Sequence, residues 1–322
     1  MHHLLTEELQ RRSGYSYTIG PYRDPVLEVE PGDSVSVDTM DCFECRLDSE
    51  ALRVSDVTRE PFLNPVNGPI YVKGARPGDA LAVRIESIRP RGPQPCGTTC
   101  LRSFMGGLAS PYDAVAAPYP EFTRRMVVTE EGVVWNKRLT LPYRPFIGTI
   151  ATAHPIFSVD TLAPGKHGGN MDLSDVCPGA TLYLPVRAEG ALLFLGDCHA
   201  LQGDGELAGA AVEFPTVTDI RLDVIRDWPI EWPLLENDRF IMATGSEKPL
   251  EEAVRIAYNN LIAWMVDKYG FNKWDAYFLA TQMGKVRVAN IVDPVFTAGA
   301  SIEKRYLIPS DEIDYDALAK TL

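Results

Sequence analysis

Six carboxylates and two of the five histidines of this chain fall within about forty residues, between Gly165 and Glu206. This stretch begins GKHGGNMD and ends GDCHALQGDGE, with an apolar strand pattern between the two ends. Carboxylate and neutral imidazole are the usual ligands of zinc and other divalent cations. Neighbouring glycines let the backbone turn tightly and approach a ligand closely. We therefore expect the chemistry in this segment, with the candidates His167, Asp172, Asp197, His199, Asp204 and Glu206.

Asp197 and His199 are expected to be a pair of cation ligands. They lie two residues apart at the end of the apolar strand pattern LLFLGDCH. Side chains two residues apart on a strand point to the same face. The alternative is a surface aspartate beside a hydrogen-bonded core histidine, in which case neither residue binds a cation.

The glycines that follow His167 predict a tight turn. Such a turn would bring His167 and Asp172 to one centre as further cation ligands. The exposed N–H groups of Gly168 and Gly169 could then hold an oxyanion, and Asn170 is expected to position a substrate. The alternative is a glycine-rich connector in which the aspartate caps a turn.

The overall composition is that of an ordinary globular protein. The chain has 322 residues, of which 45% are hydrophobic and 23% are charged, which is enough for a single large domain. Its net charge of -13 argues against nucleic acid as a partner. No apolar run approaches the roughly 20 residues that cross a bilayer, and MHHLLTEELQRR lacks the features of a signal peptide. We expect a cytoplasmic protein that binds neither nucleic acid nor membrane.

Three Pro-Gly pairs predict turns that each lead into a strand. Pro31-Gly32 precedes SVSVDT, Pro77-Gly78 precedes ALAVRIESI, and Pro178-Gly179 precedes ATLYLPV. Proline presets the first turn position and glycine supplies the positive φ of the second. Apolar and polar residues alternate after each turn, which places one face of each strand in a core.

Helical periodicity appears only late in the chain. Pro249–Tyr269 has apolar residues at spacings of three and four, and Lys273–Met283 follows an asparagine cap. A strand from Lys285 and a short helix after Ser310 complete the prediction, while residues 89–120 are expected to form a long loop. The fold class is therefore α+β and mainly β: an antiparallel β sandwich with a late helical segment, in one domain over 1–322. Its β-rich part spans 1–245, and its helical and final-strand part spans 246–322.

The six cysteines are expected to be free thiols. Cys42 and Cys45 form a CxxC, and Cys96 and Cys100 are four residues apart. A zinc site made of these two pairs is the alternative, but the pairs are far apart in sequence. Reduced cysteines are normal in a cytosolic chain.

The HGGNMD and GDCHALQGDGE motifs, with PVRAEGALLFLGD between them, resemble the acetamidase/formamidase family. The segments PGDSVSVDTMDCFE and NPVNGP extend the resemblance along most of the chain, and its length is similar to that of the shorter, acetamidase-like branch. The resemblance implies a jelly-roll-like sandwich that hydrolyses a small amide to a carboxylate and ammonia. It also implies a divalent metal and a homodimer or larger homo-oligomer.

The resemblance extends the list of site residues. It suggests Asp41 as a cation ligand contributed from a distant part of the sequence. Glu206 is the candidate general base that takes a proton from water and passes one to the leaving ammonia. Asp204 could exchange roles with Glu206, and Gln202 could bind the substrate amide. Zinc is the expected cation, and calcium or manganese are also compatible with these ligands.

Two other functions remain open at this point. A thiol amidase would use Cys198 or Cys177 as its nucleophile and would not depend on a metal. A non-catalytic β sandwich would use the same aspartates and histidines to hold a stabilising metal and would bind a small ligand without converting it.

Overall fold

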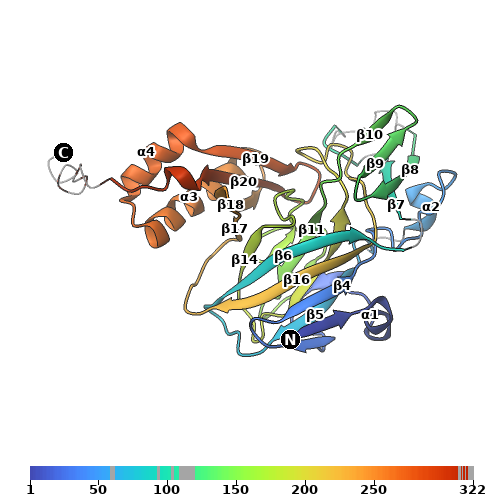
Figure 1. Ribbon diagram of the computed structural model, residues 1–322, viewed down its shortest axis with the longest axis horizontal. Helices are drawn as coiled ribbons and strands as arrows, with labels where there is room; N and C mark the ends of the chain where they lie inside the picture. The colour runs from blue at the N-terminus through green and yellow to red at the C-terminus, as the bar shows by residue number, and fades with distance from the viewer. Residues whose placement is uncertain are drawn as a thin grey trace.

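A computed structural model describes residues 1–58, 62–92, 95–102, 105–108 and 120–310, with residues 313, 315 and 317. It consists mainly of β strands, and two long helices lie near the C-terminus (Figure 1). The helices lie at one end of the molecule and a small sheet at the other. The predicted fold class is confirmed. In the part of the chain that is described, no helix has both the length and the apolar character needed to cross a membrane.

The larger sheet contains nine strands within the described residues. In spatial order they are β1 (His2–Leu5), β4 (Ser34–Asp38), β16 (Thr216–Ile225), β6 (Ala80–Pro90), β14 (Thr181–Pro185), β17 (Leu234–Glu236), β18 (Phe240–Glu247), β20 (Phe296–Glu303) and β19 (Lys285–Asn290). The three Pro-Gly turns lead into β4, β6 and β14, and Gly32, Gly78 and Gly179 all have the predicted positive φ.

A second sheet packs on the first and carries most of the polar segment described above. Its order is β13 (Gly168–Asn170), β11 (Phe146–Thr152), β15 (Leu193–His199), β5 (Val66–Val72) and β3 (Leu27–Val29). Val35 and Val83 of the larger sheet share one buried core with Ile150 and Leu195 of this sheet. Strands β1 and β4 pair in parallel, as do β3 and β5, and the remaining described pairs are antiparallel.

Two small sheets flank the sandwich. One has the order β10 (Leu139–Leu141), β9 (Gly132–Asn136), β8 (Phe122–Thr129) and β7 (Cys96–Leu101), and the other pairs β12 (Val159–Asp160) with β2 (Thr18–Ile19). The expectation of a long loop over 89–120 is wrong where β7 pairs with β8. Residues 93–94, 103–104 and 109–119 of that segment lie outside the described residues.

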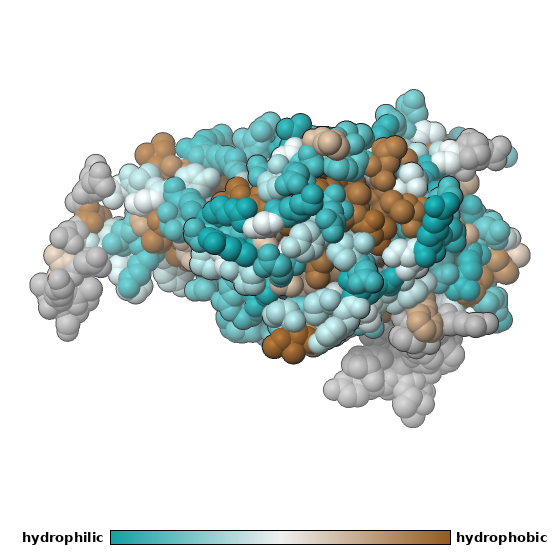
Figure 2. Space-filling model, turned by 90° about the horizontal axis from the view of Figure 1, so that it is seen from below, coloured by the Kyte–Doolittle hydropathy of each residue, from teal (hydrophilic) through white to brown (hydrophobic). Residues whose placement is uncertain are grey.

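The helices are α1 (Glu7–Ser13), α2 (Val54–Val57), α3 (Leu250–Tyr269) and α4 (Lys273–Met283), with a short 3₁₀ turn at Lys304–Tyr306. Helix α3 packs Ala257 and Leu261 against Ile241 and Ala300 of the larger sheet. Both late helices are confirmed, and most of the helix predicted after Ser310 lies outside the described residues. Hydrophilic residues cover most of the face shown in Figure 2, where hydrophobic residues gather in a few separate groups.

Candidate active site

The site is built where β11, β13 and β15 lie side by side. Strand β15 pairs with β11 so that Gly148 lies opposite Asp197, and Asp197 has a φ of +55°. A non-glycine residue in the left-handed region is uncommon and costs free energy. Asp172 and Glu206 share this conformation, with φ of +48° and +49°. Three acidic residues of one site are therefore held in strained backbone.

Asp197 and His199 face each other, as their spacing predicts. Atom Nε2 of His199 lies 3.3 Å from Oδ1 of Asp197, and both side chains are almost fully buried. The other carboxylate oxygen of Asp197 accepts hydrogen bonds from Asn64 at 2.9 Å and Thr149 at 3.2 Å. Oδ1 is therefore the oxygen directed at the imidazole.

Gln202 orients the imidazole of His199 through the ring nitrogen that does not face Asp197. Its Nε2 donates to the backbone oxygens of Asp172 and Ala289, so its Oε1 faces Nδ1 of His199 at 2.9 Å. The hydrogen bond therefore requires a proton on Nδ1, and the neutral ring carries its lone pair on Nε2. This is how a metal-binding histidine is commonly fixed. Gln202 thus contacts His199 and is not among the residues that line the cavity, and its predicted contact with a substrate stays a prediction.

Asp172 directs one oxygen into the same cluster. Its Oδ2 accepts from Asn170 at 3.1 Å and from Asn290 at 3.3 Å. Its Oδ1 is buried without a hydrogen-bond partner. A Cβ atom on Gly148 would lie 2.8 Å from this Oδ1 and 3.0 Å from Oδ2 of Asp197. The backbone oxygen of Asp197 would be still closer, at 2.7 Å, so glycine at position 148 allows both acidic residues to pack against this strand.

Asn170 connects the polar groups of the site, and its predicted contact with a substrate stays a prediction. Its amide nitrogen donates to Asp172 and, at 3.0 Å, to Asp293. Its amide oxygen accepts from Asn64 at 3.1 Å and from the hydroxyl of Thr149. It therefore holds two carboxylates in place and also lines the cavity.

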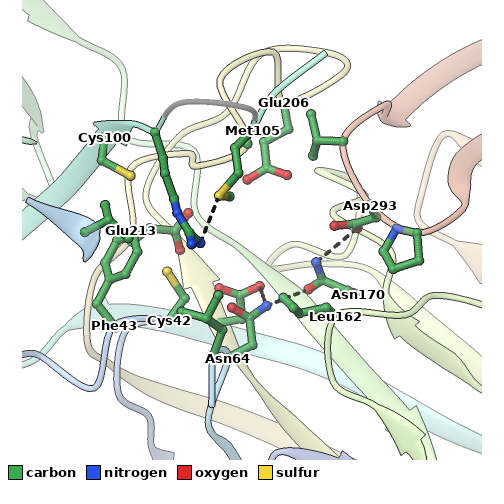
Figure 3. Close-up of a pocket in the computed structure, with 17 residues that line it drawn as sticks. Cys42, Phe43, Asn64, Cys100, Met105, Leu162, Asn170, Glu206, Glu213 and Asp293 are labelled. Carbon is green, nitrogen blue, oxygen red and sulfur yellow. Dashed lines mark hydrogen bonds between the residues drawn. The ribbon is translucent and has the colours of Figure 1, made fainter. Parts of the chain in front are cut away.

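A cavity of about 360 Å³ opens onto these groups. Glu206, Glu213 and Asp293 project their carboxylates into it from different sides (Figure 3). Ligand atoms of Glu206, Asp172 and His199 lie within 4.8 Å of one another. The rest of the wall is partly apolar and also includes Arg102. Its apolar residues are Phe43, Val54, Leu63, Met105, Leu162, Val292 and Pro294.

Sequence reasoning missed Glu213 and Asp293. Oε2 of Glu213 lies 3.1 Å from Nε2 of His199, and its side chain is buried. Glu213 is the sole charged residue between Leu207 and Pro215, and a lone acid in an apolar segment was a usable signal. Asp293 lies about ninety residues after the second motif, and its signal is weaker.

His167 does not join this cluster, to which it was predicted to contribute a ligand. Its ring lies beside Gly165 and Gly169 and belongs to neither of the potential metal-binding groups of the described chain. Burial, followed by the charge of Arg187, lowers the pKa of His167 to about 4. The positive φ of Gly168 and Gly169 turns the chain between His167 and Asn170, so the two side chains face different surroundings.

Gly168 and Gly169 do not line the cavity, and the predicted oxyanion role is not supported. The N–H of Gly168 already donates to the backbone oxygen of Gly165 at 3.1 Å. Cβ atoms here would lie 2.3 Å from the oxygen of Ile150 and 2.2 Å from that of Ala163. Both glycines are needed because other backbone passes so close.

Asp41 and Asp204 make other contacts than the predicted ones. Oδ1 of Asp41 accepts the N–H groups of Phe43 at 3.0 Å and Cys45 at 2.6 Å, so this buried carboxylate closes a turn. Asp204 has a side chain that is 58% exposed and pairs with Arg287. Its neighbour Glu206 is buried, which separates the two acids that the sequence could not distinguish.

The site has an excess of buried negative charge. Burial raises the pKa of Glu206 and of Asp293, and the nearby charge of Asp172 raises both further. Burial lowers the pKa of His199, but Glu213 and Asp197 outweigh it and raise the pKa well above its ordinary value. One imidazole is thus shared by several carboxylates. The unpartnered Oδ1 of Asp172, the oriented His199 and the space at Gly148 together fit a bound cation.

The thiols do not form a reactive centre. All six cysteines are free, as predicted. Cys198 is buried beside Thr218, and burial raises its pKa. Neither Cys198 nor Cys177 lines the cavity. Nothing in this arrangement favours a thiol nucleophile.

Comparisons with known proteins find similarity to one family along most of the chain. The model of the Acetamidase/Formamidase family matches residues 20–157 and 153–304. A crystal structure of an acetamidase from Yersinia enterocolitica has 50% sequence identity, covers 96% of this chain and 93% of its own, and has a TM-score of 0.93. An acetamidase structure from Bacillus halodurans has 31% identity, covers 94% of this chain and 98% of its own, and has a TM-score of 0.85. The acetamidase of Mycolicibacterium smegmatis is 27% identical over 87% of this chain and 81% of its own length.

Proposed function

The chain belongs to the acetamidase/formamidase family of amidases acting on non-peptide C–N bonds, and from this we propose that it hydrolyses small linear amides such as acetamide and formamide in a cation-dependent reaction. The products are a carboxylate and ammonia. The observation that carries the proposal is the buried cluster of Asp172, Asp197, His199 and Glu206, of which Asp197 and Glu206 line the cavity and in which carboxylates outnumber the imidazole that they share.

We assign the cation to Asp172, Asp197 and His199. Each presents one atom to the cluster while its other polar atom is held by a neutral partner. When bound, a divalent cation such as zinc would polarise the amide oxygen and lower the pKa of a water molecule. Manganese and calcium are also compatible with a set dominated by carboxylates.

Glu206 carries the proton in this proposal. Its carboxylate faces the cavity, and burial together with the nearby charge of Asp172 raises its pKa, so it is a stronger base than an exposed glutamate. It takes a proton from water as the water oxygen bonds to the amide carbon. It then gives that proton to the amide nitrogen as the C–N bond breaks, so that ammonia leaves.

The test is ammonia release from acetamide and formamide by the full-length protein, measured alongside metal analysis. We expect turnover that is lost with a chelator and restored by zinc or manganese. Full activity in protein shown to be free of metal would overturn the cation assignment, and failure to convert any small amide would overturn the activity. Assembly into a homodimer or larger oligomer belongs to the same proposal, and analytical ultracentrifugation tests it.

A further inference from the structure

We propose that a second divalent cation binds beside the first, between the thiolate of Cys42 and the carboxylates of Asp197 and Glu213. The proposal deepens the proposed function and rests on it, because Asp197 would be shared by both cations. The three residues come from distant parts of the chain: the turn after β4, the end of β15 and the segment before β16.

The ligand atoms of these residues are already close together. The sulfur of Cys42 and one carboxylate oxygen each of Asp197 and Glu213 lie within 4.8 Å of one another, and all three residues are buried. All three also line the cavity, and Figure 3 shows Cys42 and Glu213 on the same wall. An ion could therefore reach them from the cavity without opening the core.

The hydrogen bonding of Glu213 is a second, independent indication of a cation site. Its Oε1 accepts the N–H of Ala211 at 2.8 Å, whereas Oε2 is buried and accepts no hydrogen bond. This oxygen lies 3.1 Å from Nε2 of His199. Oδ1 of Asp197 lies 3.3 Å from the same nitrogen. The single proton that Nε2 can carry cannot satisfy both carboxylates. A buried carboxylate oxygen without a donor is costly unless a cation is present.

The donor set indicates the kind of cation. A thiolate favours zinc or cobalt over calcium and magnesium, which prefer oxygen ligands. Burial and the charges of Glu213 and Asp197 raise the pKa of Cys42 in the metal-free protein, so cation binding must displace its proton. Two neighbouring cations can hold both the attacking and the leaving groups of a hydrolysis.

Cobalt substitution tests the second site directly. Full-length protein freed of metal is titrated with Co²⁺, and the near-ultraviolet charge-transfer band of a cobalt–thiolate bond is recorded together with metal content. We expect the band to appear and the protein to bind two equivalents. Cys42→Ser should abolish the band and reduce binding to one equivalent. Cys100→Ser is the matched control, because Cys100 lines the same cavity outside the ligand group and should keep both signals.

Two further variants separate this proposal from the proposed function. Asp172→Asn should keep the thiolate band while it loses the other cation, and Glu213→Gln should weaken the band if Cys42→Ser does not fold. Absence of the band in wild-type protein, or a band that survives in Cys42→Ser, would overturn the second site even if acetamide is hydrolysed. A band that requires Cys42 in a protein without amidase activity would support the site and contradict the function.

Discussion

Oε2 of Glu213 lies 3.1 Å from Nε2 of His199, and a backbone bridge joins the same two residues. The bridge explains why an acid from outside both sequence motifs reaches the imidazole. It also means that His199 is surrounded by carboxylates from its own strand and from a neighbouring segment. A cation at this place would offset charge that one histidine cannot.

The first prediction concerns proton transfer. Glu206→Gln keeps the size of the side chain and removes its ability to carry a proton. We expect kcat for acetamide to fall by about 10²- to 10⁴-fold, with unchanged circular dichroism. Asp204→Asn is the matched control two residues away, and it should retain wild-type turnover because Asp204 is exposed and pairs with Arg287. Equal losses in both variants would contradict the assignment.

Gly148 is predicted to be essential for its lack of a side chain. The Cβ of Gly148→Ala would lie 2.8 Å from Oδ1 of Asp172, so the variant should bind less metal and lose activity. Gly203→Ala provides the comparison, because a Cβ at Gly203 meets nothing within 4 Å. Metal content and ammonia release measured on both proteins check this. Normal metal binding in Gly148→Ala would show that the space is not used.

Gln202 is predicted to control metal affinity through His199. Gln202→Ala removes the hydrogen bond that fixes the ring, and we expect cation affinity to fall about 10- to 100-fold. Competition with a chromophoric chelator measures this. A change in the KM for acetamide with unaltered cation affinity would instead place Gln202 against the substrate, as the sequence had suggested.

The fourth prediction concerns pH and the metal-free protein. Burial raises the pKa of Asp172 to about 6. The charge of His199 opposes this rise, and the charge of Asp197 adds to it. Burial likewise raises the pKa of Glu213 to about 7, against the opposing charge of His199. The ordinary values are 3.8 and 4.5, so the folded state binds more protons than the unfolded state between about pH 4 and pH 7. Their contribution to stability is therefore lost as the pH rises through this window.

Thermal unfolding with a chelator present checks whether stability falls as the pH rises. The loss of Tm between about pH 5 and pH 8 should be smaller in Glu213→Gln than in the wild type, because the variant lacks one of the two acids. Added zinc should raise Tm most at the upper end of this range, where the ligands are deprotonated. Stability that rises with pH more steeply in the wild type than in the variant would refute the prediction.

Much of the architecture followed from local patterns. Each Pro-Gly turn introduced a strand because proline and glycine preset its dihedral angles, and alternation then identified the buried faces. The boundaries of α4 agreed with its asparagine cap and periodicity. The pairing of β7 was not foreseen, because a segment rich in glycine and proline lacks a clear period of two.

The sequence by itself determined that Asp172, Asp197, His199 and Glu206 were worth attention, because polar side chains with glycines at a strand end are unusual in a core. Only the tertiary structure decided which side chains meet. It turned His167 away through two glycines with positive φ, exposed Asp204, and brought Glu213 and Asp293 in from elsewhere. Spacing along a strand fixes which residues share a face, whereas contacts across strands and the sign of φ at single residues depend on the packing of the whole chain.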